Sequence, residues 1–171
     1  MRVWWAGPFW AADVRAMPRD DDALVFRLAC RYWNDGDFDK VIALLADDIR
    51  HTVNVDALGI PWMASAEGKA DVAARLNLIR ETFLVDAFVI EALVTDAEDI
   101  RATVVGYHTH KKTRERLDVR LRFRVRVRDG LLAQIDETVD AAYFEAFERF
   151  VRYLEQTAEE LGNAPPEPFS A

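Results

Sequence analysis

The stretch RLDVRLRFRVRVRDG, from Arg116 to Gly130, alternates apolar and mostly charged residues with a period of two. This period places successive side chains on opposite faces of a β-strand. The apolar face must therefore lie against the protein interior, and the face that carries six arginines must point outward. The closing Asp-Gly pair is typical of a tight turn into a further strand. The stretch predicts a long strand in an antiparallel sheet that is covered on one side.

The outward face predicts charged pairing with the next strand, residues 131–140. Asp136 and Asp140 occupy the outward phase of that strand and can lie opposite arginines. Exposed ion pairs contribute roughly 0–1 kcal/mol each, so the alternatives for this face are a solvated surface, the interface of a homodimer and, less favoured, an anion site. The residues of the expected dimer interface are Arg120, Arg122, Arg124, Arg126 and Asp136.

Length and composition limit the class of protein. The chain has 171 residues, is 51% hydrophobic and carries a formal charge of −8, which predicts one globular domain. The acidic balance argues against nucleic acid as a partner, and no apolar run has the length of a membrane span. Cys30 is the single cysteine, which excludes an internal disulfide and fits a cytoplasmic location.

Helical and strand patterns follow one another along the chain. Helices are predicted at 20–34, 38–46, 69–83 and 141–161, and strands at 49–55, 85–96, 99–111, 116–128 and 131–140. Helices followed by an antiparallel sheet predict an α+β fold. The chain is accordingly divided into an N-terminal arm (1–20), a single domain (21–162) and a Pro-rich tail (163–171). The alternatives for the arm are a disordered segment and a segment that docks on a partner.

Two of the helices have an apolar stripe that is predicted to face the core. In the first helix the stripe is formed by Leu24, Leu28 and Tyr32. In the third it is formed by Val72, Leu76, Ile79 and Phe83.

Three pieces of the chain resemble the nuclear transport factor 2-like superfamily. They are GDFDKVIALLADD (36–48), EGK (67–69) and RDGLLAQIDETVDAAYF (128–144). The superfamily includes ketosteroid isomerases, limonene-epoxide-hydrolase-type enzymes, scytalone dehydratase and the SnoaL-like polyketide cyclases. The resemblance implies a cone: a strongly curved, mainly antiparallel sheet wraps around three N-terminal helices, a C-terminal helix follows, and an apolar pocket opens at one end. Many members dimerise through the outer face of the sheet.

Glu137 is the principal candidate for chemistry. It shares the inward phase of its strand with Ile135 and Val139. A carboxyl group among apolar side chains is expected to have a raised pKa, which suits a general acid or base. In enzymes of the limonene-epoxide-hydrolase type, a catalytic aspartate lies at what looks like the matching position. The alternative is a structural glutamate with hydrogen-bond partners.

Histidines share the inward face. His108 is predicted to be the proton partner of Glu137, and His51 to be a donor that orients the substrate. The alternative for an inward histidine is a hydrogen-bonded wall residue. Trp62, in a Pro-containing loop, is predicted to close the pocket mouth. The full set of predicted substrate-binding residues is His51, His110, Val53, Phe123, Trp33 and Trp62.

Cofactors are not predicted. His51, His108 and His110 lie on separate elements without metal-helix spacing, so no metal is expected. No nucleotide motif or Gly-rich phosphate loop is present, so no nucleotide cofactor is implied. Ketosteroid isomerases use a tyrosine and two aspartic acids, and alignment by eye places these roles on Ala29, Val53 and Phe123. That isomerase chemistry is therefore expected to be absent.

The leading hypothesis is a SnoaL-like protein that binds a small apolar, oxygen-bearing molecule. Glu137 and His108 would catalyse isomerisation, hydration or epoxide hydrolysis, dehydration or cyclisation, as in a cofactor-independent isomerase, hydrolase or lyase. The alternative is a module of the same fold that binds a ligand or dimerises without turnover.

Overall fold

A computed structural model describes residues 20–96 and 99–163 of the chain. Apart from their boundary residues, the predicted arm (1–20) and tail (163–171) lie outside the described part, so both stay predictions.

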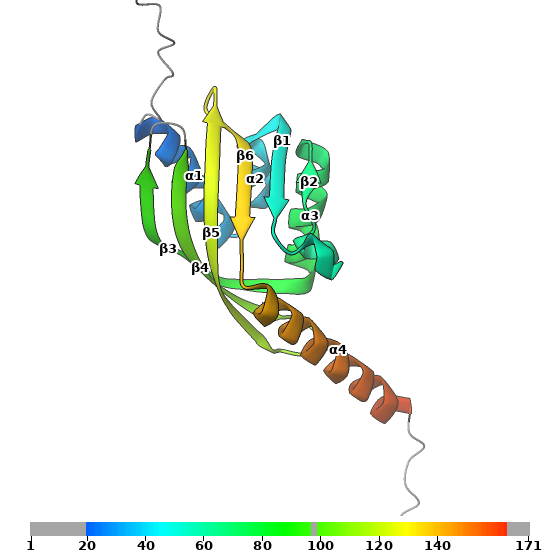
Figure 1. The fold of residues 1–171 in the computed structure, drawn as a ribbon. Helices are drawn as coiled ribbons and strands as arrows, with labels where there is room; N and C mark the ends of the chain where they lie inside the picture. Colours follow the sequence, from blue (N-terminus) through cyan, green and yellow to red (C-terminus); the bar gives the residue numbers. More distant parts are fainter. Residues whose placement is uncertain (1–19, 97–98, 164–171) are drawn as a thin grey trace, which may run out of the picture.

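The described residues form helices, two short 3₁₀ turns and a six-stranded sheet (Figure 1). The helices are α1 (Asp20–Asn34), α2 (Phe38–Ala43), α3 (Lys69–Thr82) and α4 (Ala141–Asn163), and the 3₁₀ turns are η1 (Asp56–Leu58) and η2 (Pro61–Met63). The strands are β1 (Leu45–Val53), β2 (Ala66–Glu67), β3 (Phe83–Thr95), β4 (Ile100–His110), β5 (Arg116–Arg128) and β6 (Leu131–Thr138). This arrangement confirms the predicted α+β class.

The strands lie in the order β2-β1-β6-β5-β4-β3. All neighbours are antiparallel except β1 and β6, which run parallel. The predicted alternation of β5 holds: Leu117, Val119, Leu121 and Val125 are buried, and the arginines between them are exposed. Because the sheet has this single buried face, the parity of β5 fixes which side chains of β4 and β6 also point inward.

Helices α1, α2 and α3 cover the inner face of the sheet (Figure 1). The stripe predicted for α1 is wrong, because Leu24 is 52% exposed and the buried side chains are Ala23, Phe26, Ala29, Cys30 and Trp33. Phe26 packs on Phe123 of β5, with ring centroids 5.6 Å apart. Helix α1 is thus rotated from the predicted orientation, and its aromatic residues enter the core.

The segment between α1 and α3 also differs from its prediction. Helix α2 ends at Ala43 and β1 begins at Leu45, where residues 38–46 were predicted to be helical and the strand to begin at 49. Leu45 pairs with Leu132 of β6, so parallel pairing with the last strand overrides the helical pattern of these residues. Residues 57–68, between the predicted strand 49–55 and the predicted helix 69–83, contain η2 and the short strand β2.

The outer face of the sheet carries ion pairs, although not the predicted ladder. Arg124 lies opposite Asp136 in the register, but its side chain binds Asp99 with Nε 2.5 Å from Oδ2. Arg126 binds the other oxygen of Asp99 at 2.7 Å. Asp136 accepts a hydrogen bond from Thr52 instead. The homodimer expected through this face stays a prediction.

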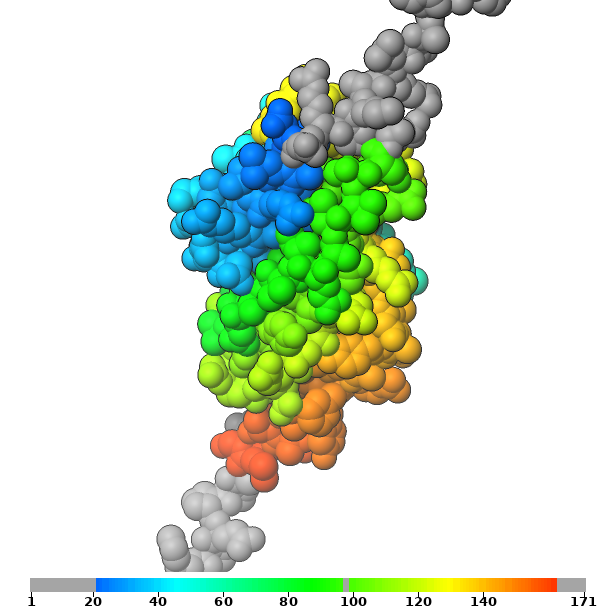
Figure 2. All heavy atoms as spheres, turned by 90° about the vertical axis from the view of Figure 1, so that its left-hand side faces the viewer, coloured from blue at the N-terminus to red at the C-terminus, as the bar shows by residue number. Residues whose placement is uncertain are grey.

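Helix α4 begins beside the body of the protein and then extends away from it (Figures 1 and 2). Its first turns pack inward through Phe144, Phe147 and Val151. Figure 2 shows α4 projecting beyond the face formed by α1, α2 and β3. Within the described residues, no helix is long and apolar enough to span a membrane.

Candidate functional site

The inner face of the sheet and the helices enclose a cavity of about 130 Å³. Its wall is formed mainly by apolar side chains from α1, α3, β5, β6 and η2, such as Phe26, Leu76, Leu121 and Ile135. Five polar or ionisable groups other than the Cys30 thiol and the Trp62 indole interrupt this wall. They are His51, Arg75, His108, Glu137 and the indole nitrogen of Trp33.

Glu137 lies on β6 and faces this cavity, as its strand phase predicts. It is 9% exposed. In the parallel register β6 places Glu137 beside Val53 and Ile135 beside His51. The side chain of Glu137 therefore projects from the same face as that of His51, which lies one inward position earlier on β1.

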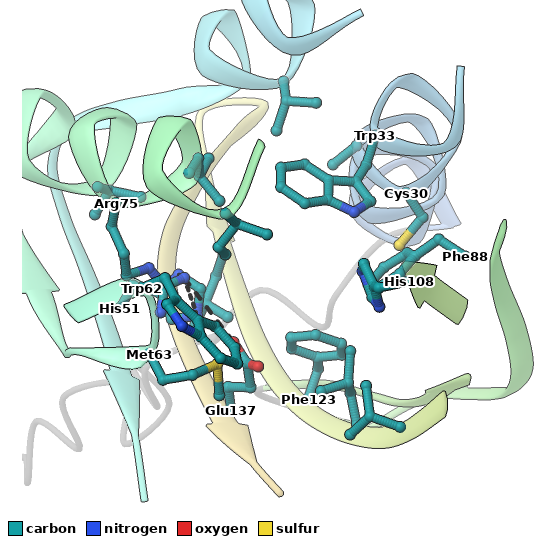
Figure 3. A pocket seen from close by; sticks show the side chains of 18 of the residues that line it. Cys30, Trp33, His51, Trp62, Met63, Arg75, Phe88, His108, Phe123 and Glu137 are labelled. Carbon is teal, nitrogen blue, oxygen red and sulfur yellow. Dashed lines mark hydrogen bonds and ion pairs between the residues drawn. The ribbon is translucent and has the colours of Figure 1, made fainter. Parts of the chain in front are cut away.

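Glu137, His51 and Arg75 form a buried polar cluster (Figure 3). His51 Nε2 lies 2.9 Å from Oε2 of Glu137. Arg75 Nη2 lies 2.7 Å from Nδ1 and 3.1 Å from Nε2 of His51, and 3.9 Å from Oε2 of Glu137. Both of these contacts to the carboxylate go to Oε2, and no hydrogen bond to Oε1 occurs among the residues that the structure describes.

The chemistry of arginine assigns the tautomer of His51. A guanidinium can only donate hydrogen bonds, so the shorter of its two contacts, at 2.7 Å, makes Nδ1 of His51 the acceptor, and the 3.1 Å approach to Nε2 is a contact without a hydrogen bond. The ring proton then lies on Nε2 and is donated to Glu137. Burial, followed by the positive charge of Arg75, lowers the pKa of His51. His51 is consequently neutral at pH 7, and both of its nitrogens contact protein groups.

The cluster holds Glu137 in its ionised form. Burial alone would raise the pKa of Glu137, but the hydrogen bond from His51 and the charge of Arg75 outweigh it and lower the pKa. The sequence-based expectation of a raised pKa was wrong in direction, because it included neither the hydrogen bond from His51 nor the charge of Arg75. An ionised carboxylate accepts protons, so the site contains a base and not an acid in its resting state.

His108 also faces the cavity, from β4, and it does not contact Glu137 within the hydrogen bonds of the described residues. Its ring lies over Gly106, where an added Cβ would come within 2.5 Å of Cε1. Burial lowers the pKa of His108, so its ring is neutral at pH 7. The structure does not bring His108 and Glu137 together as the predicted proton pair.

The other predicted binding residues divide into two groups. Trp33, Trp62 and Phe123 line the cavity. His110 and Val53 are buried but do not line it. Nδ1 of His110 lies 2.9 Å from the Thr113 hydroxyl and accepts a hydrogen bond from the Thr113 backbone, so His110 stabilises the β4–β5 turn.

Trp62 closes one side of the cavity. Its indole donates a hydrogen bond to Glu148 of α4 at 3.0 Å, and its ring packs against Phe83 and Phe144. Trp62 is only 9% exposed. The first turns of α4 thus hold η2 in place over the cavity.

Arg75 is the site residue that the sequence analysis missed. It is 4% exposed and lies on α3, three residues after Val72 and four before Ile79, both of which belong to the predicted buried stripe. Helical spacing therefore placed Arg75 on the inward face. A charged residue within an inward stripe, opposite an inward Glu137, was the signal that could have identified the pair.

No group of three or more His, Cys, Asp or Glu within residues 20–96 and 99–163 is placed to hold a metal ion. The thiol of Cys30 lines the cavity, and burial raises its pKa to about 12. This thiol is protonated at neutral pH and is a poor nucleophile.

Comparison with known proteins places this geometry in a structural context. A chain from Rhodopseudomonas palustris named as a candidate isomerase superposes with a TM-score of 0.64 at 18% identity, over 79% of this chain and 98% of that one. An NTF2-like protein from Burkholderia xenovorans superposes with a TM-score of 0.61 at 18% identity, over 75% of this chain and 95% of that one. A candidate polyketide cyclase from Xanthomonas campestris superposes with a TM-score of 0.59 at 16% identity, over 75% of this chain and 96% of that one.

These identities show a shared fold only, and no curated protein matches the chain by sequence. The family model for the SnoaL-like domain matches residues 26–135, which is more than half of the chain. The match includes α3 with Arg75, β1 with His51 and β4 with His108, and it ends two residues before Glu137. The chain therefore belongs to the SnoaL-like domain family and has the NTF2-like fold.

Proposed function

We propose that the protein binds a small apolar, oxygen-bearing molecule in its cavity and catalyses an acid-base rearrangement of it, with Glu137 as the base. The observation that carries the proposal is a buried, ionised carboxylate in the wall of an apolar cavity. Such a group is costly to bury unless it is paired. Perturbed carboxylates in clefts are candidates for catalysis.

Each member of the cluster has a distinct role in this proposal. Oε1 of Glu137 accepts a proton from substrate carbon or from a water molecule. His51 is a positioning residue, because both of its nitrogens contact protein and it fixes the carboxylate through Oε2. This role replaces the predicted one of a donor to the substrate.

Arg75 supplies the complementary electrophile. Its Nε is buried and has no hydrogen-bond partner among the described residues. A donor next to the base can stabilise negative charge on the substrate oxygen, and such donors are typically worth about 10²–10³ in kcat. A base together with an oxyanion donor fits isomerisation through an enolate, or addition of water with polarisation of an epoxide oxygen.

The size of the cavity restricts the substrate. At about 130 Å³ it is close to an engineered apolar cavity of about 150 Å³ that holds benzene. Molecules with a single small ring therefore fit better than tetracyclic steroids. Ala29 and Phe123, two of the positions to which the resemblance assigns the ketosteroid isomerase groups, are apolar and line the cavity.

The decisive experiment measures turnover of small cyclic epoxides and ketones by the wild type and by Glu137→Gln. Removing a general base is expected to lower kcat by about 10²–10⁴. Asp136→Asn is the matched control, because Asp136 is the adjacent carboxylate on β6 and contacts Thr52 and Gln134. It should retain turnover within about twofold. Full activity in Glu137→Gln would exclude Glu137 as the base.

The alternative, a binding module without turnover, is favoured by one feature. His51 and one carboxylate oxygen of Glu137 are fully engaged with each other and with Arg75, as in a purely structural network. This alternative predicts that ligands bind with similar affinity to wild type and Glu137→Gln, and that neither protein converts them.

A further inference from the structure

Three buried polar atoms of cavity-lining residues have no hydrogen-bond partner among residues 20–96 and 99–163. One is Nε of Arg75, in the Glu137 cluster, and the other two are Nε1 of Trp33 and Nδ1 of His108. Trp33 and His108 are each 7% exposed and line the cavity. Buried polar groups in native proteins are almost always hydrogen-bonded, so this pair calls for a ligand group.

The two atoms belong to the same end of the cavity. The rings of Trp33 and His108 both contact Phe88, with centroid distances of 6.3 Å and 6.4 Å. Figure 3 shows Trp33 and His108 on one side, near Cys30, and the cluster of Glu137 across the cavity. A ligand that contacts both sides must therefore have two polar groups separated by an apolar part.

The two atoms offer complementary hydrogen-bonding capacity. An indole nitrogen can only donate. Burial lowers the pKa of His108, so its ring is neutral and has one donor and one acceptor nitrogen. Nδ1 is the nitrogen that has no partner among the described residues. In the tautomer that carries the ring proton on Nε2, Nδ1 presents a lone pair.

Gly106 on β4 leaves the space that the ring of His108 occupies. Gly106 lies two residues earlier on the same face of β4, and an added Cβ would lie 2.5 Å from Cε1 and 3.2 Å from Nδ1 of the ring. Any other residue at position 106 would displace the imidazole. The absence of a side chain there keeps Nδ1 beside the cavity.

We propose that Trp33 and His108 form a hydroxyl subsite. The ligand hydroxyl accepts a hydrogen bond from Trp33 Nε1 and donates one to His108 Nδ1. The inference rests on the proposed function in that both use the same cavity, and it specifies the substrate class. The substrate is a small cyclic alcohol or phenol whose second oxygen function lies at the Glu137 end.

The test compares phenol with toluene, which has a methyl group in place of the hydroxyl. The probes are titrated into ¹⁵N-labelled protein, and the Trp33 indole signal is assigned by its loss in Trp33→Phe. Phenol should move the Trp33 indole proton downfield, and toluene should not. In His108→Phe the affinity for phenol relative to toluene should fall by about tenfold.

His110→Phe is the matched control, because His110 is a buried histidine on the same strand that does not line the cavity. It should leave the phenol-to-toluene ratio unchanged. An unchanged ratio in His108→Phe, an unmoved indole signal, or no binding of either probe would overturn the subsite. An unchanged ratio and an unmoved indole signal are also the results expected if Trp33 Nε1 and His108 Nδ1 bind only water.

The same titration in Glu137→Gln separates the two proposals. This variant lacks the proposed base but keeps Trp33 and His108, so its preference for phenol should persist even when turnover is lost. If the wild type shows no preference for phenol over toluene, but its turnover still depends on Glu137, the hydroxyl subsite is rejected and the proposed function is not.

Discussion

Replacing Arg75 with methionine tests whether the buried cluster is an ion pair on which the fold depends. Arg75 is 4% exposed and Glu137 is 9% exposed, so neither charge is solvated by bulk water. Methionine retains much of the length of the side chain and removes the charge. The variant leaves the Glu137 carboxylate buried with only the neutral His51 as a partner.

The expected loss of stability in Arg75→Met is large at neutral pH. Removing one partner of a buried ion pair costs about 3–5 kcal/mol. For a protein of this size, each kcal/mol lowers Tm by about 2–4 °C, so Tm should fall by about 6–20 °C. An exposed arginine is the control: Arg149 on α4, whose side chain is 72% exposed, should change stability by at most about 0.5 kcal/mol when replaced by methionine.

The loss should depend on pH with a definite sign. In the wild type the pKa of Glu137 is lowered, so its contribution to stability is present above the ordinary value of 4.5 and is lost as pH falls through the lowered pKa. Without Arg75, the Glu137–His51 pair binds an additional proton in the folded state. A folded state that binds more protons than the unfolded state loses stability as pH rises. The difference from wild type should therefore be small near pH 5 and large near pH 8.

Thermal unfolding followed by circular dichroism between pH 5 and 8 measures this difference. The double variant Arg75→Met with Glu137→Gln removes both charges and should recover part of the loss at pH 8, because no uncompensated charge remains. A destabilisation that is the same at every pH, or a double variant that loses the sum of both single effects, would refute the ion-pair reasoning.

Two further predictions concern the cavity wall. Burial raises the pKa of Cys30 to about 12, so roughly one part in ten thousand of its thiol is thiolate at pH 8. Cys30 should therefore resist iodoacetamide in the folded protein and react with it in guanidinium chloride. Rapid labelling of the native state would contradict its burial. Gly106→Ala should destabilise the fold by about 1–3 kcal/mol and perturb the His108 resonances, because the added Cβ lies 2.5 Å from Cε1 of His108. In a His108→Ala background this cost should shrink, and an equal cost in both backgrounds would show that the ring is not the obstacle.

The sheet was predictable because one strand determines its neighbours. The alternation in β5 fixes the inward face, and the short turns on either side carry the same parity to His108 and Glu137. A period of two leaves no intermediate orientation, so a correct assignment for β5 is correct for the whole meander. For this reason the inward position of Glu137 followed from sequence.

The helices were less predictable because their stripes are ambiguous. In α1, Leu24 and Leu28 compete with Phe26 and Trp33 for the core, and the larger aromatic side chains are the ones that are buried. The contacts between elements were also beyond the sequence. The pairing of His51 with Arg75 depends on where α3 crosses β1, which no local pattern specifies.

The downward shift of the Glu137 pKa shows why contacts between elements could not be predicted from the sequence of one strand. Strand parity correctly placed the carboxylate in an apolar setting, and burial is indeed its largest single influence. The net shift is nevertheless downward, since the hydrogen bond from His51 on β1 and the charge of Arg75 on α3 outweigh burial. An isolated inward carboxylate and a paired one look identical in the sequence of β6 alone.

The central place of β6 in the sheet has a consequence for synthesis of the chain. β6 is the last strand to leave the ribosome, and it pairs with β1 on one side and β5 on the other. Until residues 131–138 emerge, both partners have open backbone edges beside apolar surface, which is a template for aggregation. His51 and Glu137 are 86 residues apart, so the nascent polypeptide completes this buried pair and gains its protection from misassembly in the same late docking event.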